Sequence, residues 1–275
     1  MTTKLSCHTL PAGWEGAPAQ AKFWEILQQS RRWLLLLDYD GTLAPFHQDR
    51  MLAVPYAGVS ERLEALAART RGRVVIISGR QIEDLKQLLP LRQPLEMWGS
   101  HGREHLQHDG SYRVVDLNPA ERQVVDGLAN EMAVRGWGHQ LEHKPTALAV
   151  HWRGLPEEAQ RSIQNAAEAY FASVQAPATL EMMPFESGIE LRSRSRTKGQ
   201  VVAEILAEEP DDAPAAFLGD DWTDEDGFAV LGERGLGILV RPEIRESRAK
   251  FHLTPPAELI RFLDHWLEHT KESIA

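Results

Sequence analysis

An uninterrupted apolar segment that ends on an acid is the feature that constrains this chain most. Residues Trp33–Leu37 carry no polar hydrogen-bonding group except the indole N–H of Trp33, and Asp38 follows at once. A strand that is buried on both faces has this pattern, and such strands belong to parallel sheets covered by helices on both sides. The segment therefore predicts a central strand of an α/β protein.

Two further segments have the same character. Arg73–Ile77 runs into Ser78, and Ala215–Leu218 runs into Gly219 and a pair of aspartates. Segments with helical spacing of apolar residues separate these strands, which favours one parallel α/β sheet of Rossmann-like type. In such a sheet the ligand site lies at the carboxyl ends of the strands, so we expect the polar residues there to converge.

The middle of the chain reads as an insertion. Asn118-Pro119 has the form of a helix N-cap followed by proline at the first helical position. The pattern after it is helix, two short strands, helix, two short strands, which predicts a small open sheet with two helices on one face. We expect a core of residues 1–106 and 192–275, and a smaller α/β cap domain over residues 107–191. The two hairpin turns, His143-Lys144-Pro145 and residues 184–187, are expected at one edge of that sheet.

Net charge and cysteine content limit the kinds of partner and the compartment that we expect for this chain. The 275 residues carry a net charge of −10 with a pI near 5.6, which argues against nucleic acid or an anionic membrane as a partner. A single cysteine, Cys7, allows no internal disulfide, and no signal peptide or membrane segment is evident. These features indicate a cytoplasmic protein. The sequence does not fix the oligomeric state, and a monomer is compatible with it.

Several carboxylates should share the predicted site: Asp38, Asp40, Asp220, Asp221 and Asp224. Two like charges about 4 Å apart cost about 4 kcal/mol at an effective dielectric of 20, so such a group needs a cation. Oxygen ligands without cysteine favour Mg²⁺. For Asp224 an alternative stays open, in which it only complements a helix start near Thr223. Ser78, Gly79 and Lys198 stand where a turn and a helix N-terminus can hold an anion.

These residues together resemble a known superfamily, the haloacid dehalogenase-like phosphatases. The first motif is matched by Asp38-Tyr-Asp40-Gly41-Thr42, the second by Ser78, the third by Lys198 and the fourth by Gly219-Asp220-Asp221-Trp-Thr-Asp224. Their order and spacing agree over nearly the whole chain. The insertion resembles the α/β cap of the members that act on sugar phosphates.

Within this superfamily the closest resemblance is to the trehalose-6-phosphate phosphatases. It rests on Gly99-Ser-His101-Gly102-x-Glu104, Glu142-His-Lys144, His151-x-Arg153, Glu190-x-Arg192 and Thr223-Asp224-Glu225-Asp226. Phe185-Glu186 departs from the family, which often has Gly-Lys at that turn. The resemblance implies that His101, Glu142, Lys144, Arg153 and Glu190 bind the sugar phosphate.

The resemblance also assigns the chemistry. Asp38 is implied as the nucleophile that forms an aspartyl-phosphate, and Asp40 as the acid and base. Mg²⁺ is implied on Asp38, the Asp40 backbone carbonyl and Asp220, supported by Asp221 and Asp224. Thr42, Ser78, Gly79 and Lys198 are implied as phosphate ligands, Lys198 also as a catalytic residue.

The expected function is Mg²⁺-dependent hydrolysis of trehalose 6-phosphate to trehalose and phosphate, in trehalose biosynthesis. Two alternatives remain. One is a capped phosphatase for sucrose phosphate or a glycosyl-glycerate phosphate. The other is a catalytically silent module that binds a metal or a sugar phosphate, and Asp38 with Asp40 argues against it because binding requires neither.

Overall fold

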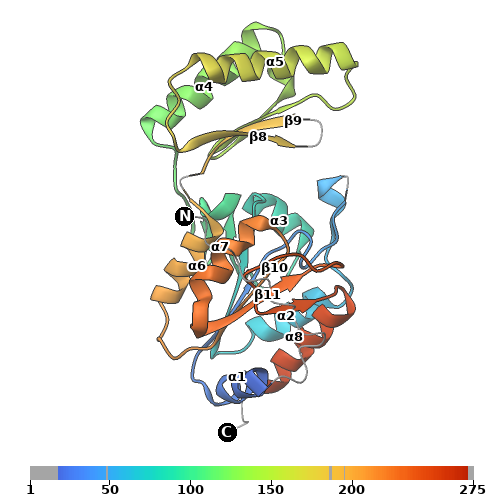
Figure 1. Cartoon of the computed structure of the whole chain (residues 1–275), viewed down its shortest axis with the longest axis vertical. Helices are drawn as coiled ribbons and strands as arrows, with labels where there is room; N and C mark the ends of the chain where they lie inside the picture. The colour runs from blue at the N-terminus through green and yellow to red at the C-terminus, as the bar shows by residue number, and fades with distance from the viewer. Residues whose placement is uncertain (1–17, 48, 186–187, 195, 272–275) are drawn as a thin grey trace. The chain divides into compact units, whose positions relative to one another are not determined.

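The computed structural model describes residues 18–47, 49–185, 188–194 and 196–271, and the chain forms two compact units (Figure 1). The larger unit takes in the chain up to Arg113 and again from Thr197, and the smaller unit is Val114–Arg196. Cys7 and Glu186 lie outside the described residues. Within the described residues, no helix has the length and apolar character that a membrane span requires.

An eight-stranded sheet forms the centre of the larger unit, in the order β12-β11-β10-β1-β2-β3-β4-β5. The strands are β1 (Trp33–Leu37), β2 (Gly72–Ile77), β3 (Glu96–Gly99), β4 (Glu104–Leu106), β5 (Tyr112–Val114), β10 (Ala215–Gly219), β11 (Gly235–Val240) and β12 (Phe251–Leu253). The pairs from β12 through to β3 are parallel, and β4 runs antiparallel to β3. The α/β architecture expected from the sequence is therefore confirmed.

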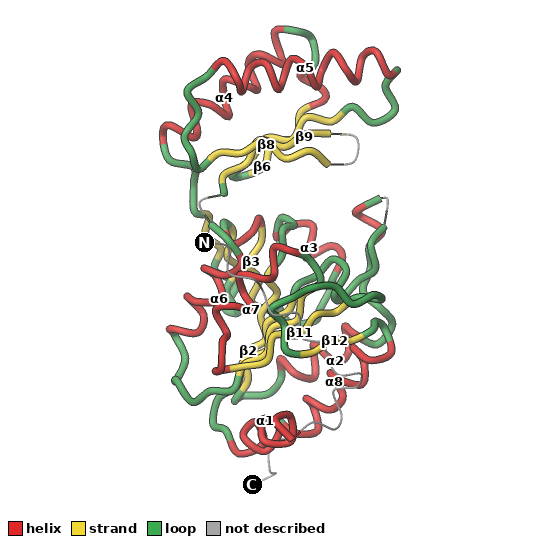
Figure 2. Tube along the Cα trace, in the orientation of Figure 1, coloured by secondary structure: helices red, strands yellow, loops and turns green. Residues whose placement is uncertain are grey.

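Alternate side chains of β1 pack into two hydrophobic cores, one on each face of the sheet. Leu35 and Leu37 pack with α1 (Pro18–Gln29), α2 (Val59–Ala67), α3 (Ile82–Leu88) and α8 (Ala257–His269). Leu34 and Leu36 pack on the other face, with α6 (Lys198–Ala207) and α7 (Glu225–Leu231). All five side chains of β1 are fully buried, because helices cover the sheet on both faces (Figure 2). This two-sided burial is the physical reason for the apolar run in the sequence.

The smaller unit is an open sheet with two helices on one face. Its strands β6 (Leu141–Lys144), β7 (Ala147–His151), β8 (Leu180–Phe185) and β9 (Gly188–Ser193) are antiparallel in the order β6-β7-β9-β8. Helices α4 (Pro119–Val134) and α5 (Glu157–Ser173) pack on one face through a core that includes Leu128, Ile163 and Leu148. Asn118 caps α4 by accepting from the Glu121 N–H at 3.0 Å, as its sequence predicts.

The smaller unit begins and ends a few residues later than the 107–191 predicted for the cap. Residues 107–113 belong with the larger unit because β5 extends its sheet and Tyr112 donates to Glu104 at 3.0 Å. At the other end, Ser193 donates to the buried Glu121 at 2.7 Å, which ties β9 to α4 up to its last residue. Short strands such as β5 carry too little apolar pattern to be recognised in a sequence.

Candidate active site

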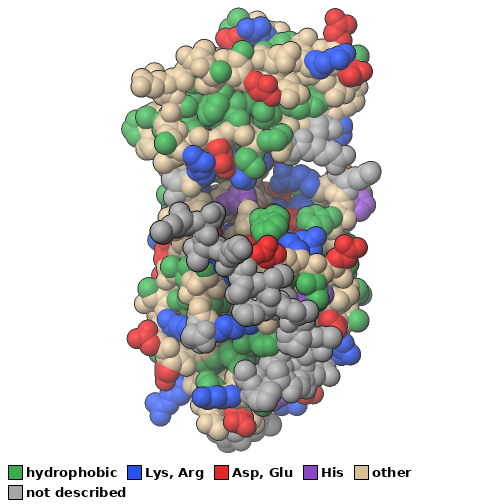
Figure 3. All heavy atoms as spheres, in the orientation of Figure 1, with side chains coloured by type: hydrophobic (Ala, Val, Ile, Leu, Met, Phe, Trp, Pro, Cys, Tyr) green, Lys and Arg blue, Asp and Glu red, His purple; other side chains and the backbone are tan. Residues whose placement is uncertain are grey.

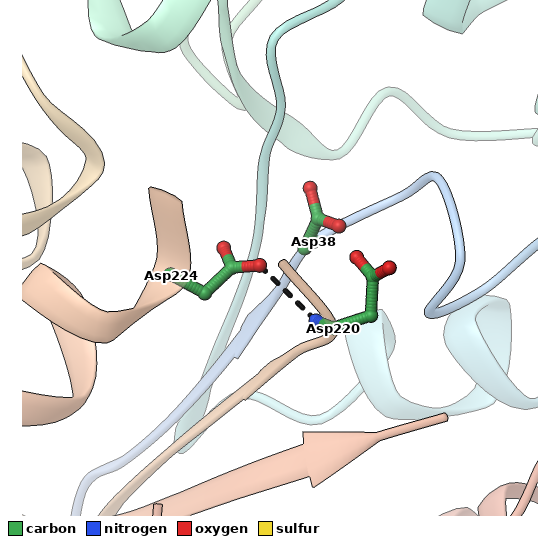
Figure 4. A group of neighbouring side chains, drawn as sticks. All are labelled: Asp38, Asp220 and Asp224. Atoms are coloured by element: carbon green, nitrogen blue, oxygen red, sulfur yellow. Dashed lines mark hydrogen bonds between the residues drawn. The ribbon is translucent and has the colours of Figure 1, made fainter. Parts of the chain in front are cut away.

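Three carboxylates meet at the carboxyl ends of β1 and β10. Asp38 follows β1, Asp220 follows β10, and Asp224 lies in the short turn that leads into α7. All three are buried, and one oxygen from each lies within 4.8 Å of the others. Figure 4 shows them pointing toward a common point, with the Asp220 N–H donating to Asp224 Oδ2 at 3.1 Å. The parallel pairing of β1 with β10 brings these residues together although 182 positions separate Asp38 from Asp220.

Lys198 supplies the positive charge inside this group. Its Nζ donates to Asp38 Oδ1 at 2.6 Å and to Asp224 Oδ1 at 2.7 Å, and the residue is only 4% exposed. Lys198 is the first residue of α6, capped by Thr197, which accepts from the Gln200 N–H at 3.3 Å. From the sequence, Lys198 was expected at a helix start where it can hold an anion. The structure places it there and also buries it, because the helix N-terminus points into the carboxylate cluster.

One lysine does not balance three buried acids. Burial raises the pKa of Asp38 to about 7, although Lys198 opposes the shift. Burial, together with the charges of Asp38 and Asp224, raises the pKa of Asp220 to about 9. Asp224 and Asp38 raise the pKa of Lys198 although burial opposes its charged form, so the lysine stays an ammonium. The cluster thus has a deficit of positive charge.

The first turn after β1 places small groups around Asp38. Thr42 is fully buried, and its Oγ1 donates to Asp38 Oδ2 at 3.4 Å. Gly41 has a φ of 74°, and a Cβ there would lie 2.2 Å from Asp220 Oδ2. Only glycine fits this position, because both the backbone angle and the nearby carboxylate exclude a side chain.

Ser78 and Gly79 end β2 beside a second tight turn. Ser78 Oγ accepts from the Arg80 N–H at 3.1 Å, which leaves the hydroxyl proton free for another acceptor. The imidazole of His101 lies over Gly79, where a Cβ would meet it at 2.7 Å, and the backbone N–H of His101 donates to the Ser78 carbonyl at 3.0 Å. His101 has a φ of 56°, which the surrounding hydrogen bonds impose.

Asp40 has a partner that the sequence analysis left out. Arg80, 7% exposed, donates to both oxygens of Asp40 at 2.6 Å each. The signal was present, because Arg80 belongs to the same strand-end turn as Ser78 and Gly79. Asp221 is exposed and lies outside the carboxylate cluster, and its N–H donates to Asp224 Oδ2 at 3.0 Å. The ligand role expected of the Asp40 carbonyl stays a prediction.

Arginines from the segment after β11 were also missed as site residues. Arg241 and Arg245 both donate to the backbone carbonyl of Asp220, at 3.3 and 3.1 Å. They place positive charge behind the acid without neutralising its carboxylate. The charged composition of this segment was visible in the sequence, but the partner of each arginine was not.

The donor set fits Mg²⁺. It consists of carboxylate oxygens, which a hard divalent cation prefers, and thiol groups are absent from it. Burial and neighbouring acids raise the pKa values of Asp38 and Asp220, and a bound cation would favour their charged forms. Asp38, Asp220 and Asp224 are the residues that would hold it.

Three of the predicted cap residues lie on the sheet face opposite α4 and α5. Glu142 pairs across Ala149 with Glu190, and Lys144 forms an ion pair with Glu190. His151 Nε2 lies 2.8 Å from Glu142 Oε2. Two alanines of β7, Ala147 and Ala149, separate the charged residues and leave a floor without bulky side chains.

The two hairpin turns of the small sheet were expected at one edge, and this was wrong. Ala147 at the start of β7 pairs with Arg192, whereas His151 at its end pairs with Gly188 at the start of β9. The turns therefore leave opposite ends of the sheet, because β7 and β9 are antiparallel neighbours. Arg153 is exposed, two residues beyond β7, at the end away from Lys144.

A parallel sheet with an acid at the end of β1, a buried lysine at a helix start and an inserted α/β unit defines a class, the capped phosphatases of haloacid dehalogenase type. The structure of Aspergillus fumigatus trehalose-6-phosphate phosphatase matches 95% of this chain and 99% of its own, at 25% identity and a TM-score of 0.65. Residues 36–256 match the family model described as trehalose-phosphatase. The chain thus belongs to the trehalose-phosphatase family.

Curated relatives agree with this assignment. Escherichia coli trehalose-6-phosphate phosphatase is 29% identical over 87% of this chain and 88% of its own length. A Mycobacterium tuberculosis protein described as an uncharacterized glycosyl hydrolase is 32% identical over 90% of this chain but only 19% of its own length. The chain thus spans about a fifth of the length of that longer relative.

The raised pKa of Asp220 predicts that cation binding depends on pH. A carboxylate with a pKa of about 9 holds a proton at pH 7, and this proton must leave before the oxygen can ligate a metal. Mg²⁺ affinity measured by calorimetry should rise by about tenfold per pH unit from pH 7 and level off above pH 9. Asp226→Asn, which removes an exposed acid outside the cluster, should keep the same slope. Equal affinity at pH 7 and pH 9 would contradict the prediction.

The burial of Lys198 predicts a large effect on stability. Lys198→Met leaves Asp38 and Asp224 facing each other without a counter-ion, so the free energy of unfolding without divalent cation should fall by about 3–5 kcal/mol. Adding Asp38→Asn removes one of the two charges and should restore part of the loss. Lys86→Met, an exposed lysine in α3, is the control. Urea unfolding checks all three, and a Lys198→Met protein as stable as the wild type would disprove the argument.

Proposed function

We propose that this chain is a Mg²⁺-dependent phosphatase that hydrolyses trehalose 6-phosphate to trehalose and phosphate through an aspartyl-phosphate on Asp38. The observation that carries the proposal is the buried group of Asp38, Lys198, Asp220 and Asp224 at the carboxyl end of a parallel sheet. Family membership supports both the reaction and the substrate.

Asp38 suits the role of nucleophile. The Lys198 hydrogen bond at 2.6 Å and the Thr42 hydroxyl at 3.4 Å hold its carboxylate in one orientation. Attack on phosphorus forms the Asp38 O–P bond and breaks the bond from phosphorus to the sugar oxygen. Bound Mg²⁺ would neutralise phosphoryl charge beside Asp38 and Asp220. The Ser78 hydroxyl, the Gly79 N–H and the ammonium of Lys198 would donate to phosphoryl oxygens as charge develops.

Asp40 would serve as acid and then as base. The sugar oxygen leaves with a proton from Asp40, and the resulting carboxylate takes a proton from the water that hydrolyses the acyl phosphate. Both oxygens of Asp40 accept from Arg80, so the transferred proton has to lie on a lone pair that Arg80 leaves unused, or one of the two bonds has to open. This makes Arg80 part of the proposed proton-transfer machinery.

The open face of the small sheet would recognise the sugar. Sugar hydroxyls donate to carboxylates and accept from ammonium groups, and the ion pair of Lys144 with Glu190 offers both next to Glu142. Assigning Arg153 to the sugar rests on the family resemblance alone. The cytoplasmic location stays a prediction from composition.

Substrate identity is the first test. Wild-type protein with Mg²⁺ should release phosphate from trehalose 6-phosphate with a higher kcat/KM than from sucrose 6-phosphate or glucosylglycerate phosphate. EDTA followed by dialysis should abolish turnover, and Asp38→Asn should lose nearly all of it because the attacking oxygen is gone. Sustained turnover after chelation would remove the magnesium assignment, and a preference for another sugar phosphate would change the substrate.

Cap variants test sugar recognition. Lys144→Ala and Glu190→Ala should lower kcat/KM for trehalose 6-phosphate by one to three decades, about 1–4 kcal/mol. Hydrolysis of p-nitrophenyl phosphate, which lacks the sugar, should change far less. Glu131→Ala, which breaks a charged pair with Arg135 on α4, is the matched control. Equal losses on both substrates would assign these residues to folding rather than to recognition.

A further inference from the structure

Large apolar side chains are exposed at the end of the larger unit that carries the acids. Five of them lie in the loops that follow β1, β10 and β11: Phe46, Leu52, Val54, Trp222 and Ile244. Exposed hydrophobic groups are also visible in Figure 3, among charges of both signs. A lone exposed apolar residue needs no explanation, but several around one functional site indicate a ligand surface.

The ring of Phe46 lies close to the acids. Its side chain is 72% exposed, yet its Cε2 lies 2.9 Å from the position of a Cβ on Gly41. Asp220 Oδ2 lies 2.2 Å from the same position, so the ring edge and this carboxylate are no more than about 5 Å apart. The ring thus lies beside the turn that follows the proposed nucleophile, with most of its surface open.

Trp222 lies two residues after Asp220 and is 63% exposed. The guanidinium of Arg245 stacks 4.3 Å from its ring centre. Arg245 is itself held by the Asp220 carbonyl at 3.1 Å and by an ion pair with Glu225. Because Arg245 is anchored in this way, its stacking on the ring holds the indole of Trp222 in one orientation.

We propose that Phe46 and Trp222 form an aromatic rim on the larger unit that binds the apolar face of a sugar ring in the leaving group. This inference rests on the proposed function and extends it, since it assigns part of sugar selection to the larger unit. The distance between the acids and Phe46 indicates which part of the substrate binds there. An oxygen of Asp38 lies within 4.8 Å of one of Asp220, so a phosphate ester held for attack by Asp38 has its sugar next to Phe46.

A pyranose suits such a rim because one face of its ring presents C–H groups while its edge presents hydroxyls. Aromatic side chains provide rigid contact area at a low cost in conformational entropy. Burial of one ring face gives a modest gain in affinity and no chemistry, so loss of the ring should act on KM rather than on kcat.

The test uses the full chain with Mg²⁺ and two substrates. Phe46→Ala and Trp222→Ala should each raise KM for trehalose 6-phosphate by about tenfold, with kcat within about twofold of wild type. Phe46→Tyr, which keeps the ring, should stay near wild type. Acetyl phosphate is the comparison substrate because a p-nitrophenyl ring would itself stack on the rim, and its KM should change far less. Ile26→Ala, an exposed apolar residue on α1, is the control.

Each result separates the alternatives. A normal KM for trehalose 6-phosphate in both alanine variants overturns the rim while the proposed function stands. Equal losses on the two substrates overturn it as well, because the ring then supports the loop around Gly41. A rise in the fraction of monomer on size exclusion would show that the rim joins two copies of the chain instead. If wild-type protein turns over no sugar phosphate, the rim fails together with the proposed function.

Fluorescence gives a readout without turnover. Trp222 is the most exposed of the tryptophans that the structure describes, so acrylamide should quench it preferentially. Trehalose with inorganic phosphate should protect the wild type from this quenching, and Trp222→Phe should lose the protected component. Unchanged quenching at a trehalose concentration that calorimetry shows to be saturating would contradict the proposal.

Discussion

The ammonium of Lys198 lies between the carboxylates of Asp38 and Asp224, and the acidic end of the larger unit is organised around this contact. Two carboxylates about 4 Å apart repel by about 4 kcal/mol at an effective dielectric of 20, so the buried group needs a cation or a bound proton among its acids. The lysine comes from the start of α6, Asp38 from the end of β1, and Asp224 from the short turn between β10 and α7. Parallel pairing of the strands and packing of α6 against them bring these three groups together. Burial, together with the charge that remains unbalanced, raises the pKa values of Asp38 and Asp220, and a divalent cation would supply the missing charge.

Chemistry and recognition make different demands on structure. The groups proposed to act on phosphorus follow the buried carboxyl ends of β1, β2 and β10 or open α6, and these packed elements hold them in place. The groups proposed to bind sugar lie on one face of a four-stranded sheet, opposite its two helices, with Ala147 and Ala149 between the charged residues. The rim of Phe46 and Trp222 belongs to loops, which can change without disturbing the sheet. This division fits a fold in which the attack on phosphorus is common to many enzymes while the leaving group differs.

Prediction from the sequence succeeded where a residue pattern has one physical cause. The strands at Trp33–Leu37 and Ala215–Gly219 were recognisable because burial on both faces forbids polar side chains. The N-cap at Asn118 was predictable because the capping hydrogen bond joins residues close in the sequence. The prediction was incomplete for β4, β5 and β12, because strands of three residues are too short to show an alternation of apolar and polar side chains. The sequence wrongly predicted that both hairpin turns leave the same edge of the small sheet. The positions of the turns depend on the order of the strands in the sheet, which the sequence of each strand does not specify.

By itself the sequence determined the α/β class, the inserted unit and the polar residues at the strand ends. Each of these features follows from interactions between residues close in the chain, or from burial, which selects an apolar residue type at each position independently. Tertiary structure alone decided that Lys198 is buried between two acids, that Arg80 holds both oxygens of Asp40, and that Phe46 lies beside Asp220. Partners such as these are 160, 40 and 174 positions apart. A sequence records which groups can pair, but the geometry of the folded chain selects the pairs, because charge and contact act through distance in space.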